Sequence, residues 1–273
     1  MSAEDCFSLI VKDLNYGYGS KNILNNINLQ FTKGKFYTIL GPNGSGKTTL
    51  LKNISRAVPV DNKKVYIDDN DINSLSSKEL AQNLASVPQN TNIDFDFTAL
   101  DIVMMGRAPY LKRFQNEQER DFKIVEDSMK MTNTWELKYK NINELSGGER
   151  QRVIIARALA QDTDILLLDE PISNLDIQHQ IEILDTVKFL SKDITVITIL
   201  HDLNLAAEYS DSLILLKNGH IKAYGSVEDV FTERNLQEVY NMDMCLIKNP
   251  ITGNPHVLPV SKNLVRETKV ANR

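Results

Sequence analysis

The sequence predicts an α/β fold, because short apolar runs with the length of buried strands alternate with segments of helical character. Residues 36–40 and 165–168 are continuous apolar runs, which is the pattern of strands buried on both faces. The first run leads into a glycine-rich loop, and residues 48–57 then have the pattern of a helix. Residues 194–200 are a third strand-sized run. These features predict a sheet whose strands lead into loops at one edge, with helices following the loops.

The elements before residue 160 follow from local patterns. Tyr-Gly-Tyr-Gly at residues 16–19 predicts a turn between two N-terminal strands. From about residue 95 to 155 the pattern becomes helical, and Phe122, Val125 and Met129 predict a helix packed on one side. The other elements predicted in this half are strands at 7–11 and 27–31, a strand at 65–68, a helix at 78–84, a strand at 85–88, and a loop at 93–99.

In the remaining half, strands and helices alternate again. Asn218-Gly219 predicts a hairpin turn between strands at 212–217 and 221–224. After Asn249-Pro250 the chain is rich in proline and polar residues, and the segment from Ser261 onward predicts a loose tail. Helices are predicted at 178–191, 203–209, 227–230 and 235–242.

Composition narrows the class of protein. The 273 residues are 42% hydrophobic and 25% charged, as in ordinary globular proteins. A net charge of −5 without runs of Lys or Arg argues against a nucleic-acid binder, so no nucleic-acid partner is expected. Two cysteines without metal spacing suit a reducing compartment. No apolar run approaches 18 residues, and the acidic N-terminus lacks a secretory core, so any work at a membrane needs another subunit.

The glycine-rich loop predicts a phosphate site. Its glycines permit positive φ angles and a close approach of the backbone to a ligand. The loop joins a strand to a helix N-terminus, where free N–H groups and the helix dipole favour an anion. Lys47 then supplies charge to phosphate oxygens, and the Thr48 hydroxyl suits Mg²⁺. The alternative is a glycine-rich turn that contains Lys-Thr by chance. The predicted nucleotide-binding residues are Gly41, Pro42, Asn43, Gly44, Ser45, Gly46, Lys47, Thr48 and Thr49.

Two carboxylates follow the strand predicted at residues 165–169. Ligands of open α/β sheets lie outside the carboxyl ends of the strands, where Asp169 and Glu170 stand. Asp169 is predicted to hold Mg²⁺ through its water shell, and Glu170 to polarise a water as general base. The alternative is an acidic cap on the following turn. The phosphate loop upstream favours the catalytic interpretation.

A second predicted anion site begins at Ser146. Ser146 and Glu149 have the spacing of a capping box, which by itself accounts for the start of a helix. A cap does not require Gly147 and Gly148, however. Two glycines strip the helix start of side chains and leave its N–H groups exposed to a ligand.

Along the chain the phosphate loop is followed by the Ser146–Glu149 segment and then by Asp169-Glu170, and the three in this order resemble the ATP-binding-cassette (ABC) transporter family. The resemblance covers about residues 7–260 and implies a RecA-like P-loop NTPase core with an antiparallel β subdomain and a helical insertion. It implies an ATPase domain over residues 5–240 with a helical subdomain at about 95–155, followed by a C-terminal extension and tail at 241–273. It further implies that the signature of one subunit, residues 146–149, covers the γ-phosphate held by the other, in a head-to-tail dimer with ATP and Mg²⁺.

Further positions match the family one by one. Tyr18 resembles the aromatic residue that stacks on adenine, although Tyr16 stands two residues away and remains an alternative. Gln89 matches the glutamine that touches Mg²⁺ or the attacking water. Asp176 falls in the loop that crosses the dimer axis, and its alternative role is a helix N-cap. His201 matches the histidine that contacts the γ-phosphate. The implied catalytic set is Glu170, His201, Gln89 and Lys47, and the implied metal set is Thr48, Gln89 and Asp169.

Residues 100–110, 200–206 and 254–259 look like the importer ATPases for iron–siderophores, haem and cobalamin. The resemblance implies a peripheral subunit on the cytoplasmic face of the membrane, with an integral-membrane permease and, indirectly, an extracytoplasmic binding protein as partners. Met104, Gly106 and Arg107 would lie near the permease-docking surface. The alternatives are a soluble ABC-type ATPase of translation or DNA repair, which usually has two cassettes or a basic surface, and a nucleotide sensor without turnover, which would have lost Glu170 or His201.

Overall fold

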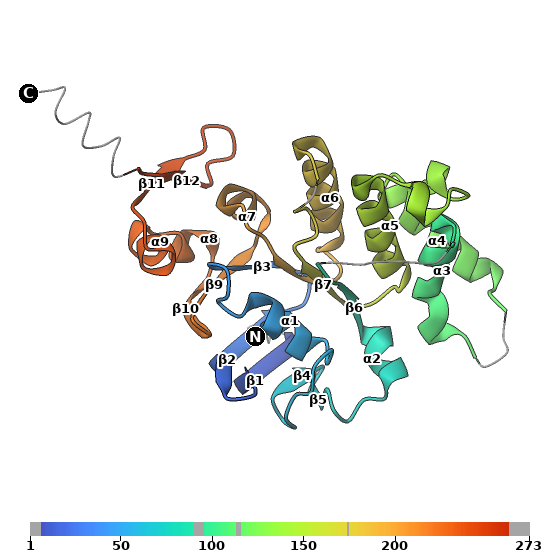
Figure 1. The fold of residues 1–273 in the computed structure, drawn as a ribbon, viewed down its shortest axis with the longest axis horizontal. Helices are drawn as coiled ribbons and strands as arrows, with labels where there is room; N and C mark the ends of the chain where they lie inside the picture. The colour runs from blue at the N-terminus through green and yellow to red at the C-terminus, as the bar shows by residue number, and fades with distance from the viewer. Residues whose placement is uncertain (1–6, 90–95, 113–115, 174, 262–273) are drawn as a thin grey trace, which may run out of the picture.

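The computed structural model describes residues 7–89, 96–112, 116–173 and 175–261. Its centre is a six-stranded sheet in the order β10-β9-β3-β8-β7-β6 (Figure 1). The strands from β9 to β6 run parallel to their neighbours, and β10 closes the edge as an antiparallel hairpin with β9. The predicted α/β core is confirmed. The strands are β3 (Phe36–Leu40), β6 (Leu84–Val87), β7 (Ile165–Asp169), β8 (Thr195–Ile199), β9 (Ser212–Lys217) and β10 (His220–Gly225).

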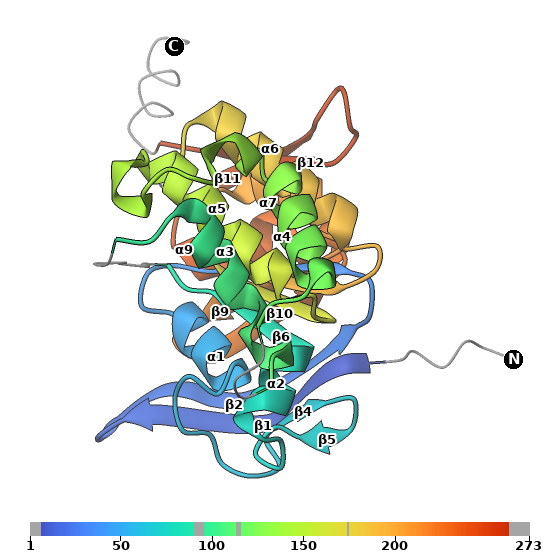
Figure 2. The same ribbon diagram turned by 90° about the vertical axis from the view of Figure 1, so that its right-hand side faces the viewer.

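A second sheet packs against one face of the central sheet. It is antiparallel, in the order β2-β1-β4-β5, and it shares a buried cluster with helix α1 (Figures 1 and 2). Phe31 of β2 meets Tyr37 of β3 edge to face, with ring centroids 4.9 Å apart. The predicted turn at residues 16–19 is too long, because β1 runs on to Tyr18. The bounds are β1 (Phe7–Tyr18), β2 (Lys21–Thr32), β4 (Val65–Ile67), β5 (Asn70–Asp71) and α1 (Lys47–Ile54).

Helices cover the opposite face and contribute to a second buried cluster, so the molecule is layered. Asn218 and Gly219, with φ of 50° and 75°, make the predicted hairpin turn between β9 and β10. The helices that contribute to this cluster here are α6 (Ile177–Leu190), α7 (Leu203–Tyr209), α8 (Val227–Val230) and α9 (Glu233–Tyr240). Helix α2 (Ser77–Asn83) instead places Leu80 in the buried cluster of the second sheet.

The segment predicted as helical forms a group of helices at one end of the molecule (Figure 1). Val125 and Met129 of α4 are fully buried as predicted, but Phe122 is 50% exposed, so the packed face is narrower than the sequence suggested. The predicted loop at 93–99 lies partly outside the described residues. The group contains α3 (Ala99–Met104), the 3₁₀ helix η1 (Met105–Tyr110), α4 (Glu119–Met131), the 3₁₀ helices η2 (Trp135–Leu137) and η3 (Ile142–Glu144), and α5 (Gly147–Ala160).

Arg107 is an internal brace of this helical group. Only 2% of the residue is exposed, and its Nε donates to Asp121 Oδ1 at 2.9 Å. Its Nη1 donates to the Ala160 carbonyl at 2.8 Å, which ties η1 to the end of α5. Gly106 is also buried, and a Cβ there would lie 2.4 Å from the Arg157 carbonyl oxygen. Arg107 and Gly106 thus make close contacts inside the subunit, and their place near a permease-docking surface stays a prediction.

Replacing Arg107 with alanine should lower the free energy of unfolding by about 3 kcal/mol, because Asp121 would remain buried without its cation. Urea unfolding measures this value. The matched control is Lys123→Ala, which breaks the exposed pair with Asp127 and should cost less than about 0.5 kcal/mol. Equal losses for the two variants would contradict the assignment of Arg107 as a brace.

The C-terminal extension contains two strands that the sequence did not predict. β11 (Met244–Lys248) and β12 (Pro255–Pro259) pair as an antiparallel hairpin, and their Met244 and Val257 side chains are buried in the main core. The predicted loose tail falls almost wholly on residues 262–273, outside the described part of the chain. Among the helices of the described residues, none has the length and apolar character needed to cross a membrane.

Candidate functional site

A polar cleft of about 550 Å³ lies at the carboxyl ends of the central parallel strands. Seven of its lining residues come from the predicted phosphate loop and the first turn of α1, and three single residues join them from other strand ends. Lys21 and Ile23 of β2 complete the lining; no motif in the sequence pointed to them. The lining residues are Lys21, Ile23, Asn43, Gly44, Ser45, Gly46, Lys47, Thr48, Thr49, Gln89, Glu170 and His201.

The loop takes the conformation for which its glycines were predicted. Gly41, Gly44 and Gly46 have φ of 150°, 75° and 108°. At Gly41 a Cβ would also lie 2.0 Å from the Leu216 carbonyl oxygen, so no other residue fits there. Helix α1 begins directly after Gly46, and no side chain caps its N-terminus. Its first N–H groups are thus available to an anion.

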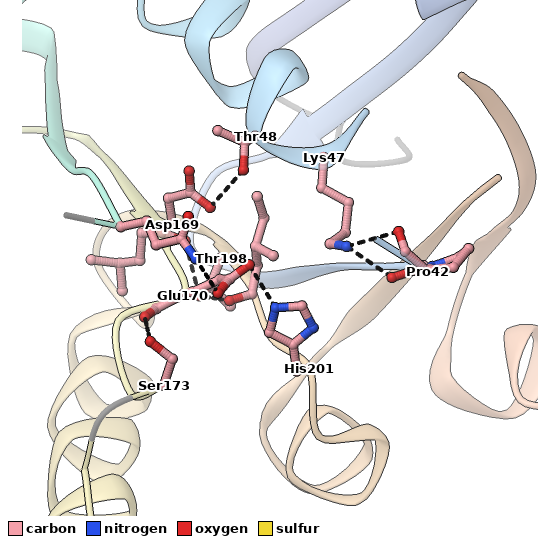
Figure 3. Close-up of polar contacts among 12 residues, drawn as sticks. Pro42, Lys47, Thr48, Asp169, Glu170, Ser173, Thr198 and His201 are labelled. Carbon is pink, nitrogen blue, oxygen red and sulfur yellow. Dashed lines mark hydrogen bonds and ion pairs between the residues drawn. The ribbon is translucent and has the colours of Figure 1, made fainter. Parts of the chain in front are cut away.

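Lys47 lies folded over this loop. Its ammonium donates to the carbonyl oxygens of Gly41 at 2.8 Å and Pro42 at 3.2 Å (Figure 3). Burial lowers the pKa of Lys47, while the nearby carboxylates of Glu170 and Asp169 oppose that shift. The ammonium therefore sits in a low-dielectric position beside acidic groups, where a bound polyanion would be attracted strongly.

Thr48 and Asp169 bring two oxygen ligands together from different elements. The Thr48 hydroxyl donates to Asp169 Oδ1 at 3.2 Å. Burial raises the pKa of Asp169, against the hydrogen bond from Thr48. A hydroxyl and a carboxylate side by side fit Mg²⁺, which prefers oxygen ligands and takes the rest of its shell from water and phosphate. A binding cation would also relieve the cost of an ionised Asp169 in this position.

Glu170 is held between two side chains from neighbouring strand ends. Gln89, after β6, donates its Nε2 to Glu170 Oε2 at 2.7 Å. His201, after β8, places Nε2 at 2.6 Å from Glu170 Oε1. The Glu170 side chain is only 11% exposed, and its backbone has a φ of 52°, an unusual value for glutamate. The strand ends of β6, β7 and β8 thus converge on one carboxylate.

The two candidate tyrosines lie near the cleft but outside its lining. Tyr16 and Tyr18 meet edge to face with centroids 5.2 Å apart. Tyr18 is 50% exposed, whereas Tyr16 packs against the core. Tyr18 pairs across the β1–β2 turn with Lys21, which lines the cleft.

The signature residues form the predicted capping box at the start of α5. Glu149 N donates to Ser146 Oγ at 3.3 Å, and Ser146 N donates to Glu149 Oε2 at 2.8 Å. Hydrogen bonds from the Ser146 backbone and side chain hold the pKa of Glu149 below its ordinary value. A Cβ at Gly147 would meet nothing within 4 Å, and at Gly148 only the Leu175 side chain. None of these four residues lines the cleft, so the structure leaves the signature apart from the phosphate loop of its own subunit.

Asp176 is the N-cap of α6, as the alternative interpretation proposed. Its Oδ1 accepts from His179 N at 3.0 Å and lies 2.8 Å from His179 Nδ1. Hydrogen bonds from the His179 backbone and ring lower the pKa of Asp176. The carboxylate is 66% exposed and lies outside the cleft lining.

The sequence of this chain is similar to that of known proteins of one family. A family model described as ABC transporter matches residues 24–173. The petrobactin import ATP-binding protein FpuD of Bacillus anthracis is 35% identical, over 97% of this chain and 98% of its own length. The ferric enterobactin transport ATP-binding protein FepC of Escherichia coli is 36% identical, over 92% of this chain and 93% of its own.

Two solved structures share the fold. One, described as a metal-chelate type ABC transporter in an inward-facing conformation, has a TM-score of 0.82 at 27% identity and covers 95% of this chain and 99% of its own. The other is a dimeric ATP-binding cassette in a post-hydrolysis state bound to ADP and phosphate. It has a TM-score of 0.70 at 32% identity, covering 80% of this chain and 98% of its own. The first likeness extends beyond the segment matched by the family model.

Proposed function

The chain belongs to the ABC transporter family and is an ATPase of that family, and from this premise we propose that two copies of it grip two ATP molecules and power the import of an iron complex. The observation that carries the proposal is the position of Ser146–Glu149 outside the cleft that contains Lys47, Glu170 and His201. Each half of the site is built for an anion, and a second copy supplies the missing half.

The proposed roles follow the geometry of the cleft. The backbone N–H groups of residues 43–49 and the Lys47 ammonium bind the β- and γ-phosphates. Thr48, Asp169 and Gln89 hold Mg²⁺, which when bound neutralises phosphate charge. Glu170 accepts a proton from the attacking water, with Gln89 and His201 fixing its carboxylate. We assign Tyr18, the more exposed of the two tyrosines and the partner of Lys21 in the sheet, to the adenine.

The dimer is proposed to join phosphate loop and signature across its interface. Ser146, Gly147, Gly148 and Glu149 of one copy would then face the γ-phosphate on the other, with Asp176 at the dimer axis. The dimeric cassette among the structural relatives supports this arrangement. ATP can drive closure only if it binds the closed dimer more tightly than the open subunits. We accordingly propose residues 5–240 as the ATPase domain and about 95–155 as its helical subdomain.

The cargo is proposed from the relatives. Their described activities are petrobactin import and ferric enterobactin transport, and the structural relative is of the metal-chelate type. Transport then requires a separate membrane permease and an extracytoplasmic binding protein, with this chain bound peripherally at the cytoplasmic face. Cobalamin and haem remain related alternatives for the cargo.

The test is to purify the full chain with its membrane partner and to measure uptake of ferric complexes in cells. The chain should co-purify with an integral-membrane protein from detergent extracts, and cells that carry only the Glu170→Gln variant should lose uptake. Recovery of the chain with ribosomes or DNA, with uptake unchanged in the variant, would favour the soluble ABC-type ATPase instead.

A further inference from the structure

His201 lies on a short connection whose two ends are fixed by different parts of the fold. On the amino side, β8 is held between β3 and β7. On the carboxyl side, Asp202 caps α7 by accepting from Asn204 N at 2.8 Å and Leu205 N at 2.9 Å. The position of α7 therefore helps to set where the His201 ring meets Glu170.

Helix α7 packs on the main buried cluster through one face. It has seven residues, and its buried side chains are those of Ala206 and Ala207. Leu203, Leu205 and Tyr209 of the same helix are partly buried against that cluster. Another face of the helix carries Asn204 and Glu208, which lie one turn apart and so project side by side.

The C-terminal hairpin binds both of these side chains. Asn204 Oδ1 accepts from the Val257 N–H at 2.7 Å, and Asn204 Nδ2 donates to the Val257 carbonyl at 3.4 Å. One asparagine thus pairs with both backbone groups of a single β12 residue. In Figures 1 and 2 the hairpin lies beside α7.

Glu208 binds the turn of the same hairpin with both carboxylate oxygens. Its Oε1 accepts from Asn249 Nδ2 at 2.7 Å and from Thr252 Oγ1 at 2.9 Å. Its Oε2 accepts from Asn254 Nδ2 at 2.9 Å. Burial acts to raise the pKa of Glu208, but these three hydrogen bonds and the nearby His256 outweigh it and lower the pKa. The carboxylate is accordingly an ionised acceptor, which makes the bonds strong.

The hairpin in turn is fixed to the rest of the subunit. A two-stranded hairpin is at most marginally stable by itself. Here Met244 and Val257 reach the main buried cluster, and Leu246 N donates to Glu233 Oε1 of α9 at 3.3 Å. A segment anchored in the core thus grips α7 at two successive turns.

We propose that the hairpin of residues 244–259 is a positioning element for the reaction, with Asn204 and Glu208 as positioning residues that hold α7 and, through it, His201. This inference rests on the proposed role of His201 in hydrolysis. Residues 254–259 resemble the importer group in sequence, but they have no part in the proposed binding and hydrolysis of ATP. Holding the His201 connection gives them one.

The test uses the full chain and steady-state ATP hydrolysis. Glu208→Ala removes the acceptor of three hydrogen bonds and should lower kcat by about tenfold, while KM for ATP changes less than about twofold because the phosphate loop is untouched. Glu208→Gln retains Oε1 for Asn249 and Thr252 and should recover most of the activity. A wild-type kcat in Glu208→Ala would overturn the proposal.

Two controls separate positioning from loss of structure. Gln237→Ala removes a hydrogen bond to Asp243 beside the hairpin without touching α7, and it should leave kcat unchanged. Should Glu208→Ala fail to fold, the exposed hairpin turn offers Thr252→Val with Asn254→Ala, which remove two of the same bonds from the other side. This pair should also lower kcat selectively, and a wild-type kcat would again overturn the proposal.

A double variant tells failure of this inference from failure of the proposed function. If the hairpin acts through His201, adding Glu208→Ala to His201→Ala should slow single-turnover hydrolysis no further. A further slowing in the double variant would show a purely structural role. Wild-type hydrolysis in His201→Ala alone would instead refute the role of His201, whatever Glu208 does.

Discussion

Glu170→Gln should slow ATP hydrolysis by about 100-fold to 10,000-fold, the usual contribution of a general base. The amide keeps the size of the side chain and can still lie between Gln89 and His201, but it cannot accept a proton from water. Binding of ATP should remain within about threefold of the wild type, because Glu170 does not hold the phosphates. Phosphate release and nucleotide affinity, measured on the same preparation, test both statements.

The matched control is Glu228→Gln, which makes the same change on an exposed residue of α8 that does not line the cleft. It should leave turnover unchanged. Wild-type turnover in Glu170→Gln would show that another group takes the proton. Loss of ATP binding in that variant would show instead that Glu170 builds the pocket.

Lys47→Met should weaken ATP binding by about 100-fold or more, because two charge-assisted hydrogen bonds to phosphate are worth roughly 3–6 kcal/mol together. Methionine keeps the length of the side chain but has no ammonium to donate to Gly41, Pro42 or a phosphate, so the loss comes from the removed cation. Burial lowers the pKa of Lys47, but the acidic groups beside it oppose this shift. Fluorescent-nucleotide titration gives the affinity.

Lys35→Met is the control for charge alone. Lys35 is exposed and precedes β3, at the opposite end of the strand from the phosphate loop. In Lys35→Met the ATP affinity should change by less than about twofold, since solvent and salt screen a charge at this distance from the phosphates. Equal losses at both lysines would mean that ATP is drawn by net charge and not by the loop.

The parts of the fold with strong local patterns could be predicted from the sequence. The run 36–40, the helix 203–209 and the strand 212–217 have the bounds that their apolar patterns indicated. The turn at 16–19 was set too long because Tyr-Gly-Tyr-Gly has turn composition, although pairing with β2 keeps it extended to Tyr18. The C-terminal hairpin was missed because Pro255, Pro259 and the polar turn hide two short strands.

The candidate site, too, was predictable only in part from the sequence. The phosphate loop, Asp169 and Glu170 follow from a strand, a turn and a helix that are contiguous in the chain. The meeting of Gln89 and His201 at Glu170 depends on the order β8-β7-β6 in the sheet, which local patterns do not contain. The burial of Arg107 could not be predicted either, because its partner, Asp121, and its place under α5 are set by tertiary packing.

Sedimentation velocity of the Glu170→Gln protein with saturating Mg-ATP gives its mass in solution. This measurement tests most directly whether each nucleotide site is shared between two copies. We expect a dimer with ATP and a monomer with ADP. Adding Gly148→Asp should return the ATP-loaded protein to a monomer, because aspartate is well tolerated at a helix start but its carboxylate is repelled by phosphate. A protein that stays monomeric when every cleft is filled with ATP would contradict a site shared between two copies.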